Sequence, residues 1–267
     1  MKTIKLHKQE HSIKIGKECP YYEPNITEDC MLELDGEVIG FYIKDVAKYS
    51  AKLSQLISIS NKEFRSNNVP KQEMSRGPQG TKADKAQREK DGENLVTQFS
   101  TILGSVAPKP HMRRPYPTIS SVHRENKSKT FIKAMWGASV EAEKIIKQLT
   151  PEIYKTQLEL FKDVDKKWRF GNMFTSSISN FNIAAAYHRD TGNIVGAVNV
   201  ILTKRNNSSG GSLNVPDYNV TFEQADNSML VYPAWKNIHG VTPIIKTSED
   251  GYRNSLIFYP LKAFKGI

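Results

Sequence analysis

Residues 183–202, IAAAYHRDTGNIVGAVNVIL, place a short apolar run before His188 and Asp190 and a longer apolar run after a Thr-Gly-Asn turn. Short apolar runs separated by turn residues are typical of antiparallel strands. The same pattern continues through the part of the chain that follows Trp168. The expected strands are 183–187, 194–202, 211–215, 219–222, 229–232, 241–245 and 255–259. Their close spacing predicts a sandwich or a jelly roll.

The chain upstream of this region predicts helices and one hairpin. Residues 139–149 and 151–164 are helix candidates, and Thr150 followed by Pro151 is typical of a cap and a first-turn proline. Residues 31–34 and 38–43 predict a hairpin, because the Asp-Gly pair between them favours a tight turn. A helical stretch is expected over 43–59.

These elements predict an α+β fold with a double-stranded β-helix (jelly roll) core, supporting helices and an N-terminal extension. Three segments are expected within one catalytic domain. Residues 1–60 form an N-terminal α/β extension that packs on the core, residues 61–130 form a basic, loop-rich segment that contacts DNA, and residues 131–267 form the jelly-roll core.

Positive charge is concentrated in one part of the chain. The 267 residues include 38 Lys and Arg and 28 Asp and Glu, which gives a formal charge of +10. Residues 62–133 alone hold 15 basic and 7 acidic residues, a net charge of +8. A local excess of this kind attracts polyanions such as nucleic acid. A solvated surface segment can have the same excess of basic residues. Charge alone therefore leaves open whether residues 62–133 bind nucleic acid or are only exposed to solvent.

Other features exclude whole classes of protein. No apolar run approaches the roughly 20 residues that span a bilayer, and the polar, lysine-rich start is unlike a secretory signal. The two cysteines, Cys19 and Cys30, have no metal-ligand spacing and predict free thiols in a reducing compartment. A membrane protein and a disulfide scaffold are excluded. We expect an intracellular, cytoplasmic protein with no obligate protein partner.

Two histidines and one carboxylate in the strand-rich region have the order of a metal site. His188 and Asp190 are two residues apart, so on an extended chain their side chains point to the same side. His239 follows after about four expected strands. Two imidazoles and one carboxylate are the ligand set of non-haem Fe(II). The alternative is structural, with a capping Asp190 and a hydrogen-bonded core His239.

An Arg-x-Ser pair, Arg253 and Ser255, opens the last expected strand. Both side chains are expected on one strand face, where the guanidinium and the hydroxyl can bind a carboxylate such as the distal one of 2-oxoglutarate. His-x-Asp, a later His and Arg-x-Ser in this order resemble the jelly-roll 2-oxoglutarate/Fe(II) oxygenases. The alternative for Arg253 is an ordinary surface position.

The wider sequence is similar to the TET/JBP branch of that superfamily. The similar stretches are Ala184–Asp190, Gly210–Leu213, Tyr232–Trp235, His239–Val241 and Tyr252–Ser255, within about residues 110–264. The chain lacks the cysteine-rich, zinc-binding region of animal TET enzymes and the separate DNA-binding domain of JBP. Small phage and bacterial members of the branch occur, which implies a location in the cytoplasm of a bacterial or phage-infected cell.

The resemblance implies that His188, Asp190 and His239 hold Fe(II), that Arg253 and Ser255 bind 2-oxoglutarate, and that O2 is the co-substrate. It also implies oxidation of the 5-methyl group of a pyrimidine in DNA. The favoured reaction is 5-methylcytosine to 5-hydroxymethylcytosine, and thymine to 5-hydroxymethyluracil remains open. A duplex substrate requires the base to be flipped out of the stack.

Further residues are candidates for cofactor and DNA contacts. Asn182 lies six residues before His188 and is therefore expected on the same strand face, where it can reach 2-oxoglutarate or the base. The alternative is that it only satisfies a strand edge. Arg76, Arg113 and Arg114 are the preferred DNA-binding residues, because arginine binds phosphate through two parallel hydrogen bonds.

Two other function classes remain as alternatives. The first is an oxygenase that acts on a protein, a free nucleotide or a small molecule, which would not need the basic segment. The second is a non-catalytic DNA-binding protein that keeps a decayed jelly roll. The three metal ligands and Arg253 are all present, which argues against decay.

Overall fold

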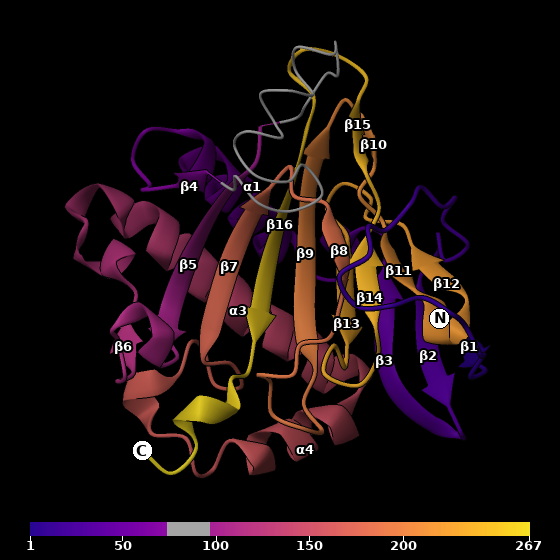
Figure 1. Cartoon of the computed structure of the whole chain (residues 1–267), viewed down its shortest axis with the longest axis horizontal. Helices are drawn as coiled ribbons and strands as arrows, with labels where there is room; N and C mark the ends of the chain where they lie inside the picture. The colour runs from indigo at the N-terminus through magenta and orange to yellow at the C-terminus, as the bar shows by residue number, and fades with distance from the viewer. Residues whose placement is uncertain (74–96) are drawn as a thin grey trace.

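Two mainly antiparallel sheets face each other and enclose the interior of the molecule (Figure 1). The structure is a computed structural model, and it describes residues 1–73 and 97–267. The main sheet has the order β1-β2-β3-β13-β9-β16-β7-β5-β4, with β6 paired to β5, and the smaller sheet has the order β12-β11-β14-β8. A two-stranded ribbon, β10-β15, lies beside them. The expected α+β jelly roll is confirmed.

The strands are β1 (Lys2–Leu6), β2 (Cys30–Leu34), β3 (Glu37–Ile43), β4 (Gln72–Glu73), β5 (Phe99–Val106), β6 (Thr118–Ile119), β7 (Ser176–Phe181), β8 (Ala185–His188), β9 (Asn199–Asn206), β10 (Ser208–Gly210), β11 (Leu213–Val215), β12 (Val220–Phe222), β13 (Met229–Tyr232), β14 (His239–Val241), β15 (Ile244–Lys246) and β16 (Tyr252–Tyr259). The α-helices of the described residues are α1 (Ala51–Arg65), α3 (Lys129–Leu149) and α4 (Pro151–Leu160), and short 3-10 helices include η1 (Val46–Lys48) and η2 (Pro110–Met112).

Alternation along the central strands gives the main sheet two different faces. On β9, Val200 and Leu202 belong to the core beneath the helices, whereas Ile201 faces the smaller sheet. Leu256 and Phe258 of β16 also belong to the helix-side core. Helices α1 and α3 pack against each other across that face, behind the sheet in Figure 1. The opposite face is therefore free to form a cavity with the smaller sheet.

The predicted N-terminal hairpin is confirmed, and it is part of the main sheet. β2 and β3 pair across Asp35 and Gly36, which have φ angles of 53° and 85°. Positive φ at both central residues matches a tight hairpin turn, and Gly36 adopts it without strain. Because β3 also pairs with β13, residues from the N-terminal segment continue the jelly-roll sheet.

The structure corrects several of the expected elements. Residues 99–106 lie in the segment expected to be loop-rich, but they form β5, whose residues 99–104 pair with β7. The helix expected over 43–59 spans 51–65 instead, because residue 43 ends β3 and Ser50 caps the helix by accepting a hydrogen bond from the Leu53 amide. Helix α3 begins at Lys129, ten residues before the expected start at 139.

The described residues bear on two classes that the sequence excludes, a disulfide scaffold and a membrane protein. Cys19 and Cys30 are both unpaired and buried, as expected of free thiols. No helix within residues 1–73 and 97–267 is long and apolar enough to cross a membrane.

Candidate active site

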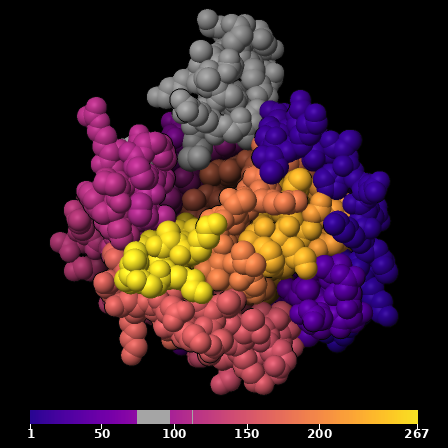
Figure 2. Space-filling model, turned by 60° about the horizontal axis from the view of Figure 1, so that its bottom comes forward, coloured from indigo at the N-terminus to yellow at the C-terminus, as the bar shows by residue number. Residues whose placement is uncertain are grey.

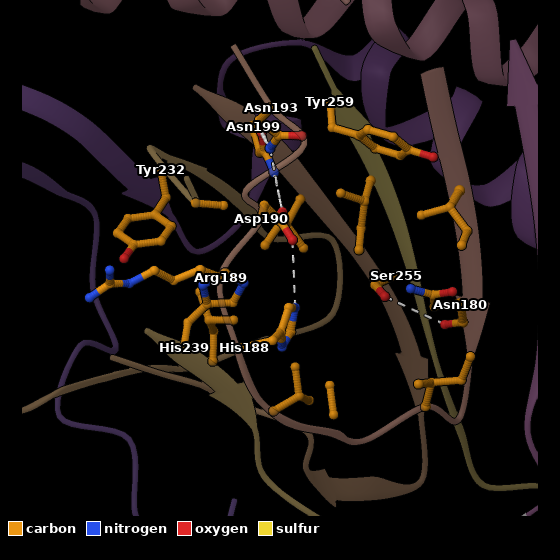
Figure 3. Close-up of a pocket in the computed structure, with 18 of the residues that line it drawn as sticks. Asn180, His188, Arg189, Asp190, Asn193, Asn199, Tyr232, His239, Ser255 and Tyr259 are labelled. Atoms are coloured by element: carbon orange, nitrogen blue, oxygen red, sulfur yellow. Dashed lines mark hydrogen bonds and ion pairs between the residues drawn. The ribbon is translucent and has the colours of Figure 1, made fainter. Parts of the chain in front are cut away.

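Two neighbouring strands of the smaller sheet and the turn that follows one of them bring the three candidate metal ligands together. His188 ends β8, His239 begins β14, and the two residues are direct partners in the antiparallel register. Asp190 opens a turn that closes with a hydrogen bond of 2.9 Å from the Asn193 amide to the Asp190 carbonyl. One ligand atom from each residue lies within 4.8 Å of the other two (Figure 3). The spacing is therefore short enough for a single metal ion.

Backbone carbonyls orient both imidazoles. Nδ1 of His188 lies 2.8 Å from the Ala186 carbonyl oxygen, and Nδ1 of His239 lies 3.1 Å from the Asn237 carbonyl oxygen. A carbonyl oxygen only accepts, so each Nδ1 carries the hydrogen and each Nε2 keeps its lone pair. The Nε2 atom of His188 faces Asp190, with 3.6 Å to Oδ1. Both rings are thus held in the tautomer that binds metal through Nε2.

The protonation state also favours metal binding. His239 is 5% exposed, and burial, helped by the nearby His188, lowers the pKa of His239 to about 4. Its imidazole is therefore neutral at physiological pH, and no proton competes for the lone pair. His188 and Asp190 are more open, with side-chain exposures of 42% and 33%. The accessible side of the site is consequently the side of His188 and Asp190.

A cavity of about 410 Å³ extends from these ligands between the two sheets. Its apolar wall is made by alternate residues of both sheets, namely Ile178, Ile201, Leu213, Val241 and Ile257. Figure 2 shows this part of the molecule hollowed between the N-terminal segment in indigo, the segment near residues 100–125 in magenta and the C-terminal residues in yellow. The site is accordingly a lined pocket that opens to solvent.

Arg253 and Ser255 line the same cavity from β16, as alternation along that strand predicts. Arg253 is 2% exposed, and its Nε has no hydrogen-bond partner. Burial, and then the charge of Arg205 on the adjacent strand, lowers the pKa of Arg253 to about 9. The guanidinium remains charged at neutral pH, so a buried cation faces the cavity without an acid partner among the described residues. Burying such a charge is costly unless an anion is bound.

Arg205, the cross-strand partner of Arg253, has a different environment. Its guanidinium donates to the carbonyl oxygens of Gly210, Ser208 and Gln224. Those bonds satisfy Arg205 within the fold, whereas Arg253 keeps an unpaired donor. The donor sets therefore fit a divalent metal at the two histidines and Asp190, and a carboxylate at Arg253.

The expected position of Asn182 is wrong. β7 ends at Phe181, and Asn182 turns the chain with a φ of 55°, so it does not share a strand face with His188. Its Oδ1 accepts a hydrogen bond of 2.9 Å from the Arg253 amide, and Asn182 does not line the cavity. A left-handed asparagine is a common chain-turning residue, which the sequence pattern did not reveal.

Sequence reasoning missed Asn180, which does line the cavity. It stands on β7 opposite Ser255, and the Ser255 hydroxyl lies 3.5 Å from the Asn180 carbonyl oxygen (Figure 3). It was missed because the expected strands begin at residue 183, so no strand was predicted over residues 176–181. Asn193 and Asn199 also line the cavity beside Asp190 and were not singled out from the sequence.

The predicted DNA-binding residues are only partly described. Arg76 lies outside the described residues. Arg113 is exposed and has a φ of 58° where η2 ends, and Arg114 donates a hydrogen bond of 2.6 Å to the Ala107 carbonyl. Neither arginine lines the cavity. Their contact with DNA stays a prediction.

Comparisons with known proteins agree with this architecture. Residues 84–262 match the family model Tet_JBP, described as the oxygenase domain of the 2OGFeDO superfamily. The solved structure of NgTET1 in complex with 5mC DNA superposes with a TM-score of 0.57 at 14% identity, covering 95% of this chain and 84% of that chain. At that identity the likeness concerns the fold.

Two more distant structures match with lower scores. OsALKBH1 gives a TM-score of 0.41 at 11% identity, with 90% of this chain and 98% of that chain covered. A 2OG-Fe(II) oxygenase family oxidoreductase from Burkholderia pseudomallei gives 0.35 at 12% identity, with 76% and 89% covered. No curated protein matched the chain by sequence.

Proposed function

The chain belongs to the Tet/JBP family of the 2-oxoglutarate- and Fe(II)-dependent oxygenase superfamily, and within that family we propose that it hydroxylates the 5-methyl group of a pyrimidine in DNA. The favoured substrate is 5-methylcytosine, and the product is then 5-hydroxymethylcytosine. The observation that carries the proposal is the cavity that has three clustered metal ligands on one wall and, on another, a buried guanidinium whose Nε has no hydrogen-bond partner.

Two further observations support DNA as the substrate. The structural neighbour NgTET1 was solved with 5mC DNA. In addition, residues 62–133 hold 15 of the 38 basic residues and only 7 acidic ones, an excess that a small-molecule oxygenase does not need. Thymine in DNA remains the second candidate, because 5-methylcytosine and thymine carry the same 5-methyl group.

In the proposed mechanism, three side chains of the smaller sheet and its turn hold the metal. His188 and His239 supply Nε2 lone pairs, since the Ala186 and Asn237 carbonyls occupy both Nδ1 positions. Asp190 supplies one carboxylate oxygen. With these three protein ligands, a bound Fe(II) would keep open positions for 2-oxoglutarate and O2. When bound, Fe(II) and 2-oxoglutarate activate O2, and the oxidation of the methyl group accompanies release of succinate and CO2.

The other wall orients the co-substrate. Arg253 binds the distal carboxylate through its guanidinium, whose Nε is unpaired, and Ser255 adds its hydroxyl from the same strand face. Asn180 faces Ser255 across the β7–β16 pair and is placed to donate an amide hydrogen bond. The isoleucine, leucine and valine side chains between the two walls cover the methylene carbons and exclude water.

The base enters from the open side of the metal site. His188 is the more exposed histidine, and His239 is buried behind it, so the substrate methyl approaches past His188 and Asp190. A base within a duplex cannot reach a pocket between two sheets, so we propose that the target nucleotide is flipped out. The remaining duplex then lies over the face seen in Figure 2.

Nucleoside mass spectrometry tests the proposed reaction. The protein is incubated with Fe(II), ascorbate, 2-oxoglutarate and DNA that contains both 5-methylcytosine and thymine. We expect 5-hydroxymethylcytosine to accumulate, together with succinate. Accumulation of 5-hydroxymethyluracil instead would identify thymine as the substrate.

A metal-ligand variant is the control for this experiment. His188→Ala removes an Nε2 ligand and should abolish both products while the circular dichroism spectrum stays that of the unsubstituted protein. Succinate without either hydroxymethyl nucleoside would contradict DNA pyrimidines as substrates and favour another substrate for the same oxygenase site.

A further inference from the structure

Asp190 is held by two buried asparagines that the proposed mechanism does not use. Asn199 is the first residue of β9 and is 2% exposed, and Asn193 closes the turn that begins at Asp190 and is 3% exposed. Nδ2 of Asn199 lies 2.9 Å from Oδ2 of Asp190. Nδ2 of Asn193 lies 2.8 Å from Oδ1 of Asn199. Figure 3 shows both amides on the side of Asp190 that faces away from His188.

The direction of this amide chain is fixed by its chemistry. An ionised carboxylate only accepts hydrogen bonds, so Asn199 must present its NH2 group to Asp190. The Asn199 carbonyl oxygen then points away from Asp190 and needs a donor, because an unsatisfied buried acceptor is costly. Asn193 provides that donor. A flipped Asn199 amide would place oxygen against the carboxylate and NH2 against NH2.

Backbone hydrogen bonds hold Asn193 in place. The backbone amide of Asn193 donates a hydrogen bond of 2.9 Å to the Asp190 carbonyl oxygen. Asn193 also forms an isolated β-bridge with Leu261 near the C-terminus. Asn199 is fixed in turn by its strand pairing with Tyr232. Neither asparagine can follow Asp190 if the carboxylate rotates, so the amides constrain the carboxylate.

The two oxygens of Asp190 therefore have different roles. Oδ2 is occupied by Asn199, and Asn193 Nδ2 lies 3.5 Å from it. Oδ1 lies 3.6 Å from the Nε2 atom of His188, on the metal side. A carboxylate can bind a metal through one or both oxygens. Binding through both would use a position that the proposed reaction needs for 2-oxoglutarate or O2.

We propose that Asn199, locked by Asn193, is a positioning residue that makes Asp190 a one-oxygen metal ligand and thereby sets metal affinity. The inference rests on the metal site of the proposed function and adds to it the pair of side chains that controls its carboxylate. It makes no assumption about which base is the substrate.

Metal titration of the full chain tests this inference without catalysis. Mn(II) is added in the absence of O2, and free Mn(II) is measured by electron paramagnetic resonance. Loss of a side chain that orients a metal ligand costs about 10-fold to 100-fold in metal affinity, so Asn199→Leu should raise the dissociation constant of Mn(II) within that range. Leucine is similar in size but cannot donate a hydrogen bond.

Asn61→Leu is the matched control. Asn61 is also buried and has two side-chain partners, Tyr252 and Asn254, but it lies on α1 on the other side of the main sheet. This variant should bind Mn(II) like the unsubstituted protein. A dissociation constant for folded Asn199→Leu within a factor of about two of the control would overturn the inference, since the ordinary effect is at least about 10-fold.

Asn193→Ala keeps the test decisive if Asn199→Leu does not fold. It leaves Asn199 in place but removes the hydrogen bond that Asn193 donates to the Asn199 carbonyl oxygen. We therefore expect weaker Mn(II) binding and a changed visible spectrum of the Co(II) form. Unchanged affinity and an unchanged spectrum would overturn the inference. Failure of the unsubstituted protein to bind Mn(II) would overturn the proposed metal site itself, and His188→Ala supplies the baseline for that result.

Discussion

Arg253 is the residue whose surroundings most restrict what the cavity can bind. It is a buried cation with an unpaired donor, and its neighbour Arg205 is already satisfied by carbonyl oxygens. A buried charge in this state is stabilised by an anion that enters the cavity. Its surroundings therefore favour a carboxylate ligand more specifically than the Arg-x-Ser spacing does.

Substitution of Arg253 should weaken 2-oxoglutarate binding. A hydrogen bond to a charged group contributes about 1.5–3 kcal/mol, which corresponds to roughly 10-fold to 150-fold in affinity. We expect Arg253→Ala to raise the KM for 2-oxoglutarate within that range. Arg253→Lys should recover part of the loss, because lysine keeps the charge but not the planar fork.

Lys204→Ala is the control for the Arg253 variants, since Lys204 is on the adjacent strand and pairs with Asp226. Its KM for 2-oxoglutarate should equal that of the unsubstituted protein. An unchanged KM in Arg253→Ala would remove Arg253 from the co-substrate site.

The sequence correctly predicted the positions of residues that depend only on the two-residue alternation of side chains along an extended chain. His188 and Asp190 were expected on one side of an extended chain, and Arg253 and Ser255 on one strand face, and all four line the cavity. Asn182 failed because a left-handed residue interrupts the strand. Asn199 was not predicted because its role depends on a contact with a loop residue nine positions earlier.

At the scale of elements, the N-terminal strap, residues 7–25, covers the free edge of β8. The Gly16 amide donates to the Tyr187 carbonyl, and the Tyr187 amide donates to the Lys17 carbonyl, each at 2.8 Å. His11 also pairs with Asp217 at 2.5 Å. The strap therefore protects the edge of the strand that carries His188, since an uncovered edge has unpaired backbone groups.

Gly240 tests how closely the strap packs on the metal-binding strands. A Cβ at Gly240 would lie 2.8 Å from the Cys19 Cβ and 3.0 Å from the Tyr187 ring. We expect Gly240→Ala to lower the free energy of unfolding by about 1–3 kcal/mol, as overpacking does, and to speed proteolysis within the strap. Limited proteolysis followed by mass spectrometry measures the second effect.

Gly192→Ala is the matched glycine control. A Cβ there meets only a Leu261 methyl at 3.6 Å, which is ordinary van der Waals contact. Strap proteolysis should stay at the unsubstituted rate in this variant. Equal rates in Gly192→Ala and Gly240→Ala would contradict close packing of the strap.

Element prediction was accurate where local turn chemistry decided the structure and less so where tertiary pairing did. The Asp35–Gly36 hairpin forms as expected because both turn residues favour positive φ. β5 was missed because its apolar residues, Phe99, Ile102, Leu103 and Val106, do not alternate with polar ones, and because the strand is stabilised by pairing with β7 near the β4 edge of the main sheet. Pairing of that kind depends on strands distant in sequence.

At the scale of the whole molecule, helices cover one face of the main sheet and the opposite face holds the cavity. This division implies that a long polyanion approaches from the cavity side. Arg113 is exposed where η2 ends, and Arg114 is half-buried beside it. These two arginines are the described members of the predicted DNA contacts.

The salt dependence of DNA binding tests that assignment. Each lost phosphate contact reduces the slope of log K against log salt by about 0.9 for duplex DNA. Arg113→Ala/Arg114→Ala should therefore reduce the slope by roughly 1–2 and weaken binding to all sequences alike. The measurement is fluorescence anisotropy of a labelled duplex over a series of salt concentrations.

A charge-matched variant on the helical face is the control. Lys52 and Lys144 lie on α1 and α3, and both pair with Glu141. Lys52→Ala/Lys144→Ala also removes two positive charges but should leave the slope unchanged. A similar loss of slope in both double variants would mean that binding follows net charge and would contradict a specific contact at Arg113 and Arg114.

Oxygen-isotope labelling tests the central claim most directly, because an oxygenase transfers an atom of O2 to its product. The protein is incubated with Fe(II), 2-oxoglutarate and 5-methylcytosine-containing DNA under ¹⁸O₂ in ordinary water. The DNA is then digested, and the masses of the released nucleosides are measured by mass spectrometry. We predict 5-hydroxymethylcytosine with the heavy isotope in its hydroxyl group, formed together with succinate. A hydroxymethyl nucleoside that carries only oxygen from water, or no oxidised pyrimidine at all, would contradict a methylpyrimidine dioxygenase.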